Sequence, residues 1–185
     1  MIRIETPRLI LRELTPQDAP ALLPILGDAE NMRWYPRAFT PAEIANGIER
    51  QIERYRNGTG LLGMVLQETG GLVGDCGPAW QDVEGRPELE IGYHMHPAWQ
   101  NRGLATEAAR AACEYAFASL GVEAVISMIR PENLPSRRVA EKNGLNVDRV
   151  VFWRGYDHCV YRLDKERFPR VNGGGQSSEI RFITG

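Results

Sequence analysis

The segment Gln100–Thr106 (QNRGLAT) has the residue types expected of a site that binds an anion. It predicts a polar turn with one glycine, followed by a helix that begins near Leu104. Backbone N–H groups in the first turn of a helix have no partner within it and lie at the positive end of the helix dipole, which suits a pyrophosphate. Gly103 would let such a ligand approach the backbone, and Arg102 would add a charge at the rim. The alternative is a loop that only connects a strand to a helix.

Side chains that could accept a proton lie just before this segment. Glu90 is in a predicted strand, and it could remove a proton from a substrate. Because Glu88 and Glu90 alternate with apolar residues, both could instead form the solvated face of that strand. His94 and His96 are rival bases on one strand face. No third ligand is suitably spaced beside them, so no metal site is predicted.

A short helix predicted over residues 134–143 carries two polar residues at its start. Asn133 and Ser136 are three residues apart, so both project from the first turn toward the same side, where they could bind a ligand. Asn133 could equally be the N-cap of this helix, with Pro135 tolerated in the first turn.

The remaining pattern predicts the elements that position these residues. Helices are predicted to begin at Pro16, Pro41, Gly103 and Leu134, and seven strand-like runs cover residues 8–13, 61–68, 71–80, 88–95, 123–129, 146–154 and 157–163. This order predicts an α/β (α+β) domain with a mixed, mostly antiparallel central sheet of about seven strands and helices on both faces. We expect a single domain over residues 1–168. The tail, residues 169–185, contains Ile180, Phe182 and Ile183, which predicts that it packs on the domain or on a partner subunit.

The composition argues against several classes of function. The chain has 185 residues, with 22 Lys and Arg against 24 Asp and Glu, and its net charge of −2 is unlike that of a nucleic-acid-binding domain. No apolar run approaches the roughly 20 residues that a membrane helix needs. The first residues lack the apolar core of a signal peptide, so we expect a cytoplasmic protein without nucleic-acid or membrane partners. Cys76, Cys113 and Cys159 form no CxxC pair and are expected to be reduced thiols.

Several separate motifs resemble those of one known family. Gln100-x-x-Gly103-x-Ala105 resembles the pyrophosphate-binding motif (Q/R-x-x-G-x-G/A) of the GNAT acetyltransferases. The segments that resemble the RimJ/RimL-type branch of that family are Glu5–Arg12, Leu89–Tyr93, Pro131–Leu145 and Gly155–Asp157. Together they span about residues 5–165, in the order in which the family has them.

The resemblance implies a single acyl-CoA N-acyltransferase-like domain that uses acetyl-CoA as a co-substrate and no metal. It also implies that the sheet splays between the strands at residues 88–95 and 123–129, and that a backbone N–H near Tyr93–Met95 polarises the acetyl carbonyl. The coenzyme-binding residues that it implies are Tyr93, His94, Met95, Gln100, Asn101, Arg102, Gly103, Leu104, Ala105, Thr106, Asn133 and Ser136.

The reaction implied by the resemblance is direct attack of a primary amine on acetyl-CoA in a ternary complex. Glu90 matches a family glutamate and would act as the base, directly or through a water molecule. Ser136 would protonate or hydrogen-bond the departing sulfur. Many GNAT enzymes have a tyrosine where this chain has Ala140, and that departure supports an alternative, a catalytically inactive acyl-CoA-binding regulatory domain.

The acceptor implied by the family is a protein N-terminus or a small-molecule amine. An α-amino group has a pKa of about 7.7–8.0 and a lysine about 10.4, so a site with one carboxylate base favours an amine of low pKa. Core packing is the commoner use of aromatic residues. Those predicted to line the acceptor side are nevertheless Trp34, Tyr35, Trp80, Trp153 and Tyr156. By analogy with the family, a homodimer is also considered.

Overall fold

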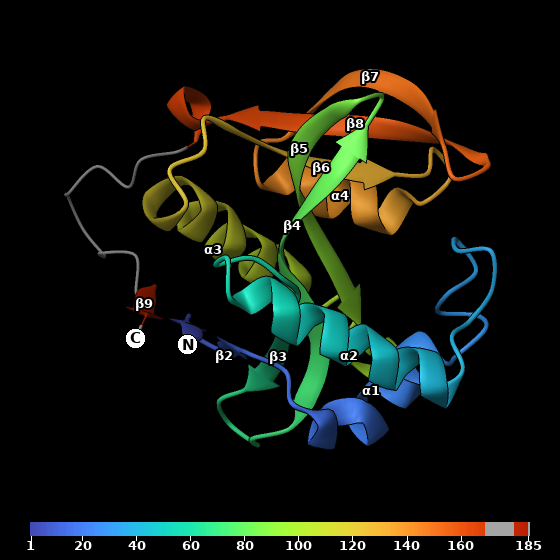
Figure 1. Ribbon diagram of the computed structural model, residues 1–185, viewed down its shortest axis with the longest axis vertical. Helices are drawn as coiled ribbons and strands as arrows, with labels where there is room; N and C mark the ends of the chain where they lie inside the picture. Colours follow the sequence, from blue (N-terminus) through green and yellow to red (C-terminus); the bar gives the residue numbers. More distant parts are fainter. Residues whose placement is uncertain (169–179, 185) are drawn as a thin grey trace.

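The structure of the protein, a computed structural model, describes residues 1–168 and 180–184 (Figure 1). Its helices are α1 (Ala19–Leu26), α2 (Pro41–Tyr55), α3 (Leu104–Ser119) and α4 (Leu134–Lys142). Its strands are β1 (Ile2–Glu5), β2 (Leu9–Arg12), β3 (Leu62–Leu66), β4 (Leu72–Val83), β5 (Arg86–Met95), β6 (Ala124–Ile129), β7 (Asn146–Trp153), β8 (Tyr156–Asp164) and β9 (Arg181–Thr184).

The strands form one sheet in the order β7-β8-β6-β5-β4-β3-β2-β1-β9. Only the β5–β6 pair of the described strands is parallel, so the predicted mixed, mostly antiparallel α/β sheet is confirmed. The predicted number of about seven strands is wrong, because the described residues form nine. The two additional strands are β1 and β9, each four residues long. Each has only two apolar residues, whereas the equally short β2 has three in succession and was predicted.

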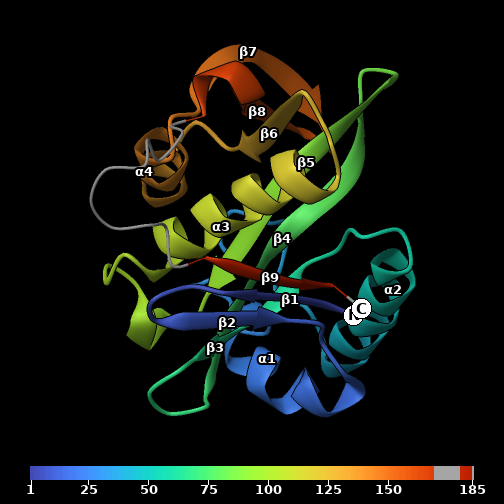
Figure 2. The same cartoon turned by 90° about the vertical axis from the view of Figure 1, so that its left-hand side faces the viewer.

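Helices pack against the sheet over separate hydrophobic cores. The larger core lies under α3, which crosses β4 and β5 in Figure 2 and buries five of its seven alanines together with Tyr115 and Phe117. A second core joins α1 and α2 through Leu22, Ile25 and Ile48. Burying a large aliphatic side chain contributes about 1.5–3 kcal/mol, so these two cores fix where the helices lie on the sheet.

β5 and β6 are neighbours in the sheet, but they stay together over a very short distance. Their parallel pairing has a single register position, Glu90 opposite Ile126. Ser127 extends the contact by donating from Oγ to the Ile91 carbonyl at 2.8 Å. Beyond this point the strands diverge, so the predicted splay between them is confirmed. The divergence leaves one edge of β5 open.

The C-terminal strand lies beside the N-terminal one. β9 pairs antiparallel with β1, with Ile2 opposite Thr184 and Glu5 opposite Arg181. The ring of Phe182 packs 5.8 Å from that of Tyr115 on α3. Residues 169–179 and 185, on which the rest of the predicted tail packing falls, lie outside the described residues.

Candidate active site

The turn before α3 has a left-handed backbone at two positions. Asn101 has a φ of 59° and Gly103 a φ of 78°. Gly103 is the N-cap of α3 and supplies no side-chain cap. The first hydrogen bond of the helix runs from the Glu107 N–H to the Gly103 carbonyl at 3.0 Å, so the N–H groups of residues 104–106 precede that first bond. They are available to an anion at the positive end of the helix.

The carboxylate of Glu107 holds this turn against the N-terminal strands. Its Oε1 accepts from Thr6 Oγ1 at 2.7 Å and from the Arg8 N–H at 2.9 Å, and its Oε2 accepts from Arg8 Nε at 2.6 Å. Arg8 in turn donates from Nη1 to the Arg102 carbonyl at 2.9 Å. The turn is therefore fixed by side chains from outside its own strand and helix before any ligand binds.

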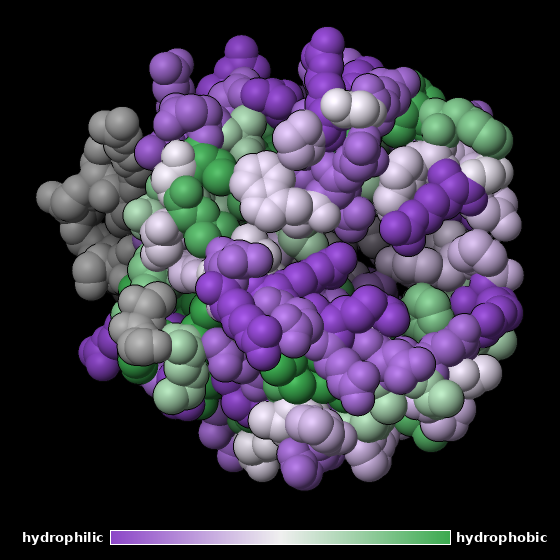
Figure 3. All heavy atoms as spheres, viewed as in Figure 1, coloured by the Kyte–Doolittle hydropathy of each residue, from purple (hydrophilic) through white to green (hydrophobic). Residues whose placement is uncertain are grey.

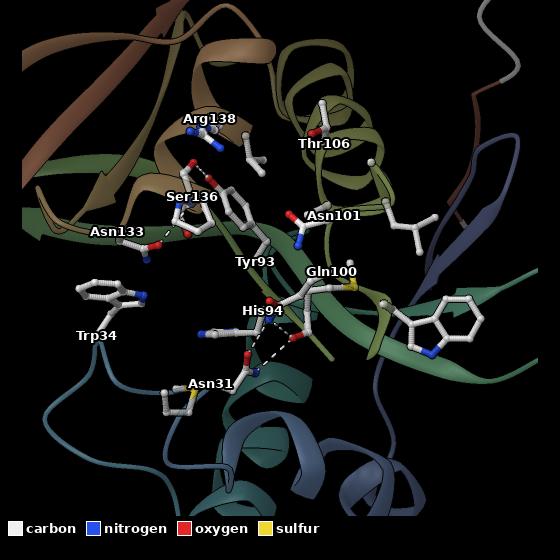
Figure 4. A pocket seen from close by; sticks show the side chains of 18 of the residues that line it. Asn31, Trp34, Tyr93, His94, Gln100, Asn101, Thr106, Asn133, Ser136 and Arg138 are labelled. Atoms are coloured by element: carbon white, nitrogen blue, oxygen red, sulfur yellow. Dashed lines mark hydrogen bonds between the residues drawn. The ribbon is translucent and has the colours of Figure 1, made fainter. Parts of the chain in front are cut away.

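A cavity of about 330 Å³, the donor cavity, opens in front of this helix end (Figure 4). Eleven of the twelve predicted coenzyme-binding residues line it: Tyr93, His94, Met95, Gln100, Asn101, Gly103, Leu104, Ala105, Thr106, Asn133 and Ser136. Arg102 does not line it, because its guanidinium stacks over the Trp99 ring at 4.5 Å. Trp99 itself lines the donor cavity, so the charge of Arg102 at the rim stays a prediction.

Four polar residues of the donor cavity were not predicted, namely Asn31, Arg33, Arg138 and Lys142. Arg138 and Lys142 are four residues apart on α4, so they lie on the same helix face as neighbours, and both line the cavity. That spacing was a signal in the sequence. Asn31 comes from an irregular loop and bridges Gln100 Nε2 and the Met95 carbonyl at 2.7 and 3.1 Å, as Figure 4 shows. Nothing in the sequence pattern pointed to Asn31.

The open edge of β5 faces the space beside this cavity. The His96 N–H bonds Val73 on β4, so by the alternation of an antiparallel ladder the backbone groups of Ile91, Tyr93 and Met95 point away from β4. The Ile91 and Met95 carbonyls accept bonds from Ser127 and Asn31. The backbone of Tyr93 lies between them, where β6 has already diverged.

A second cavity, of about 390 Å³, lies on the other side of Tyr93 and His94, and we call it the acceptor cavity. The two cavities share Trp34, Tyr35, Tyr93, His94, Asn133 and Ser136. Figure 3 shows the surface hollowed between the β6–β8 part and the α1–α2 part, with mostly hydrophilic side chains around the hollow. Of the predicted acceptor residues, Trp34, Tyr35, Trp153 and Tyr156 line the acceptor cavity. Trp80 does not, because its side chain points to solvent and is 49% exposed.

Glu90 lies in the acceptor cavity and is held there by two donors. Gln81 Nε2 donates to Oε2 at 2.8 Å, and the Met128 N–H donates to Oε1 at 3.3 Å. Burial raises the pKa of Glu90, and the two donors oppose this only in part. Glu88, two residues earlier on β5, instead forms an ion pair with Arg149, whose Nη2 lies 2.6 Å from its Oε2. The two glutamates thus have different surroundings, and a carboxylate with a raised pKa is a better proton acceptor.

His94 is bonded at both ring nitrogens. Nδ1 lies 2.7 Å from Oδ1 of the buried Asp75, and Nε2 lies 2.7 Å from the Tyr35 hydroxyl. Burial opposes a charged imidazole, but the Asp75 carboxylate outweighs it and raises the pKa of His94. His96 lines neither cavity and accepts from the Ala98 N–H through Nδ1 at 3.1 Å. Neither histidine therefore presents a free nitrogen base, and Glu90 is the better placed proton acceptor.

The start of α4 brings Ser136 to the junction of the two cavities. Asn133 accepts from the Ser136 N–H at 3.3 Å, so the N-cap interpretation of Asn133 is correct, although its side chain also lines both cavities. The Tyr93 hydroxyl donates to the Ser136 carbonyl at 2.8 Å and ties β5 to α4. Ala140 is 2% exposed and packs in the core, so this position cannot deliver an acid to the cavities.

Two further observations concern residues 1–168 and 180–184. They contain no group of three or more His, Cys, Asp or Glu side chains arranged to hold a metal ion. No helix within them is long and apolar enough to cross a membrane.

Two cavities meet where the sheet splays, one at a helix N-terminus and one around a buried carboxylate, and such a pair is typical of a protein that transfers a group between two substrates. Comparison with known proteins identifies the family. Residues 8–146 match a family described as "Acetyltransferase (GNAT) domain", and the chain belongs to the GNAT acetyltransferases. The predicted resemblance to the RimJ/RimL-type branch is confirmed, and so is the prediction of an acetyltransferase.

Individual relatives agree with this assignment. YnaD of Bacillus subtilis (strain 168), an N-acetyltransferase described as uncharacterized, is 29% identical over 144 residues, which cover 78% of this chain and 82% of YnaD. An acetyltransferase of the GNAT family from Bacillus anthracis has a TM-score of 0.77 and 26% identity, covering 89% of this chain and 99% of that one. A RimL ribosomal L7/L12 α-N-protein acetyltransferase in complex with coenzyme A shares the fold, with a TM-score of 0.69, 18% identity, and coverage of 86% and 95%.

Proposed function

We propose that this acetyltransferase moves the acetyl group of acetyl-CoA to a primary amine by direct attack in a ternary complex. The observation that carries the proposal is the meeting of the two cavities at Tyr93, His94 and Ser136, with Glu90 on the acceptor side. A donor and an acceptor bound in these cavities would touch at that junction. Bringing two reactants together in this way removes much of the entropic barrier to their reaction.

The donor cavity fits coenzyme A by its polar groups. The N–H groups of residues 104–106 suit the pyrophosphate, and Arg138 and Lys142 add positive charge on the facing helix. Gly103 and Ala105 leave room for close approach to the backbone. The complex of the RimL relative with coenzyme A supports the same choice of ligand by analogy.

The chemistry that the residues supply follows from their positions. Acetyl-CoA supplies a thioester whose C–S bond breaks as the amide C–N bond forms. The Tyr93 N–H, at the open edge of β5, would donate to the carbonyl oxygen as negative charge develops there. Glu90 would take the proton that the amine loses, and Ser136 Oγ would donate to the departing sulfur. Ser136 takes this role because Ala140 offers no hydroxyl.

The acceptor on this proposal is an α-amino group or a small amine of low pKa. One carboxylate with a raised pKa can deprotonate such an amine near neutral pH more easily than it can a lysine side chain. The aromatic side chains of Trp34, Trp153 and Tyr156 would pack against the body of the acceptor.

The test is to mix the purified protein with acetyl-CoA and a panel of peptides and small amines, and to follow free thiol with a colorimetric reagent. Acceptor-dependent thiol release is expected, with acetylated product seen by mass spectrometry. Calorimetric binding of coenzyme A without thiol release for any acceptor would support the inactive regulatory domain instead. Absence of coenzyme A binding would overturn both interpretations.

A further inference from the structure

Three arginine side chains line the acceptor cavity and come from three separate elements. Arg54 is in the last turn of α2, Arg130 follows β6, and Arg154 is in the turn between β7 and β8. Glu90 is the acidic residue among the described lining residues. An ionised Glu90 therefore leaves an excess of positive charge in this cavity. The protein as a whole has a net charge of −2, so the excess is local.

These arginines lack the close carboxylate partner that some other arginines of the described chain have. Arg8 and Arg149 each lie 2.6 Å from a glutamate oxygen. In contrast, Arg54 and Arg154 make no ion pair within the described residues, and Arg130 Nε lies 3.9 Å from an oxygen of the exposed Glu132. The buried Nε of Arg130 has no hydrogen-bond partner.

Aromatic rings hold two of the guanidinium groups in place. Arg130 lies 4.0 Å over the Tyr156 ring, and Arg154 lies 4.1 Å over the Trp153 ring. A guanidinium stacked on a ring keeps its N–H donors free at its edge. Because the rings already restrict these long side chains, the side chains lose less conformational entropy when a ligand binds. Arg130 Nη1 donates to the Trp34 carbonyl at 3.4 Å. The remaining N–H donors of the two stacked guanidinium groups make no hydrogen bond within the described residues and lie in the lining of the cavity.

The backbone at Arg154 has a conformation that arginine seldom adopts. Arg154 has a φ of 50° and Gly155 a φ of 89°, so both central residues of the hairpin turn are left-handed. Turns of this kind favour Asn, Asp or Gly, and a long side chain at the first position lowers stability. Non-glycine residues in this region are concentrated at functional sites.

The histidine beside these arginines adds no charge at neutral pH. Burial lowers the pKa of His158, and the nearby Arg130 lowers it further. Any positive charge on His94 is balanced by the Asp75 carboxylate, which lies 2.7 Å from its Nδ1. The positive charge that faces the cavity therefore comes from the three arginines.

We infer that the acceptor is a primary amine that also carries a carboxylate or phosphate group, bound by Arg54, Arg130 and Arg154 while its amine faces Glu90. The inference rests on the proposed function and narrows its substrate. Arginine is the side chain best suited to such oxyanions, because its planar donors match their geometry in pairs. A cavity of about 390 Å³ is in the size range of sites for small molecules.

The experiment compares matched pairs of acceptors in the thiol-release assay. Linear ω-amino acids of two to six carbons are set against their carboxamides, and O-phosphoethanolamine is set against ethanolamine. We expect kcat/KM to be at least tenfold higher for the acidic member of at least one pair. The length series locates the distance between amine and acid, and the two kinds of pair distinguish a carboxylate from a phosphate ligand.

Variants then assign the preference to the arginines. Arg154→Asn is expected to fold at least as well as the natural chain, because Asn suits the left-handed turn, and to bring the ratio of acidic to neutral acceptors at least threefold closer to one. Arg54→Gln should do the same, whereas its control on the same helix, Arg50→Gln, should not, because Arg50 is exposed and lies outside both cavities.

The outcomes separate this inference from the proposed function. Equal kcat/KM within every pair, or a preference unchanged in Arg154→Asn and Arg54→Gln, would overturn the inference while leaving an acetyltransferase of other amines. Coenzyme A binding without acetylation of any amine, neutral or acidic, would overturn both. A preference that the two cavity variants lose and Arg50→Gln keeps would establish the inference.

Discussion

Replacing Gly103 with alanine tests whether the left-handed turn before α3 positions the donor site. A Cβ at this position would meet Arg8 Nη2 at 3.5 Å, which is ordinary contact, so the change adds backbone strain without a clash. A left-handed φ of 78° costs an alanine about 1 kcal/mol relative to glycine. For a chain of this length that corresponds to a fall in Tm of about 2–4 °C.

The same strain should weaken coenzyme A binding. If the turn relaxes, the N–H groups of residues 104–106 lose their common direction. A hydrogen bond to a charged group is worth about 1.5–3 kcal/mol, so loss of one raises Kd about tenfold or more. Isothermal titration calorimetry with coenzyme A measures this change, and urea denaturation measures stability in the same preparation.

Gly121→Ala is the matched control, at the other end of the same helix. Gly121 has a φ of 67° and no atom within 4 Å of an added Cβ, so it should lose similar stability and keep its affinity for coenzyme A. If Gly103→Ala binds coenzyme A as tightly as Gly121→Ala does, the turn does not position the donor and the reasoning is refuted.

Three other variants test the acid–base groups. Glu90→Gln should lower kcat/KM roughly a hundredfold at pH 8. Because the pKa of Glu90 is raised in the fold, the natural chain loses stability as pH rises through that pKa. In urea denaturation, Glu90→Gln should therefore be more stable than the natural chain at pH 8 and as stable as the natural chain below about pH 4. A kcat/KM of Glu90→Gln equal to that of the natural chain at pH 8 would contradict the role of Glu90. Asp75→Asn should lower the free energy of unfolding by about 1.5–3 kcal/mol at pH 6 and by less at pH 9. The raised pKa of His94 stabilises the fold below about pH 6.5, and that stabilisation is lost as pH rises through the pKa of His94 in the folded state. An equal loss at both pH values would refute an ion pair. Ser136→Ala should lower kcat about tenfold without changing coenzyme A affinity, and an unchanged kcat across pH would exclude Ser136 as the donor to sulfur.

The parts of the fold with strong local signals were predictable from sequence. The helical period after Gly103, and the glycine itself, marked α3 and its N-terminus. Strands β3 to β8 were each long enough to show alternation or an apolar run. β1 and β9 were not, because each has only two apolar residues in four and the two strands pair with each other from opposite ends of the sequence. Such pairing leaves no local pattern.

The site was predictable where one element supplies neighbouring residues, and less so where the chain folds back. Residues 100–106 and the Asn133–Ser136 pair lie on one loop or helix turn, so their spacing predicted their proximity. The prediction that Trp80 lines the acceptor side was wrong, because an aromatic residue on a strand does not show which face of the sheet is buried. The contact of His94 with Asp75 joins two strands, and the sequence does not show their register.

The hydrogen bonds that the Glu107 carboxylate accepts from Thr6 and Arg8 have a practical consequence for handling this protein. They tie the donor turn to the strand hairpin at the amino terminus, and β1 of that hairpin also carries β9 (Figure 2). An affinity tag joined next to β1 or β9 would therefore lie at the sheet edge that Glu107 connects to the turn before α3. Affinity tags on this enzyme are best joined through long linkers and removed by cleavage before ligand affinities are compared.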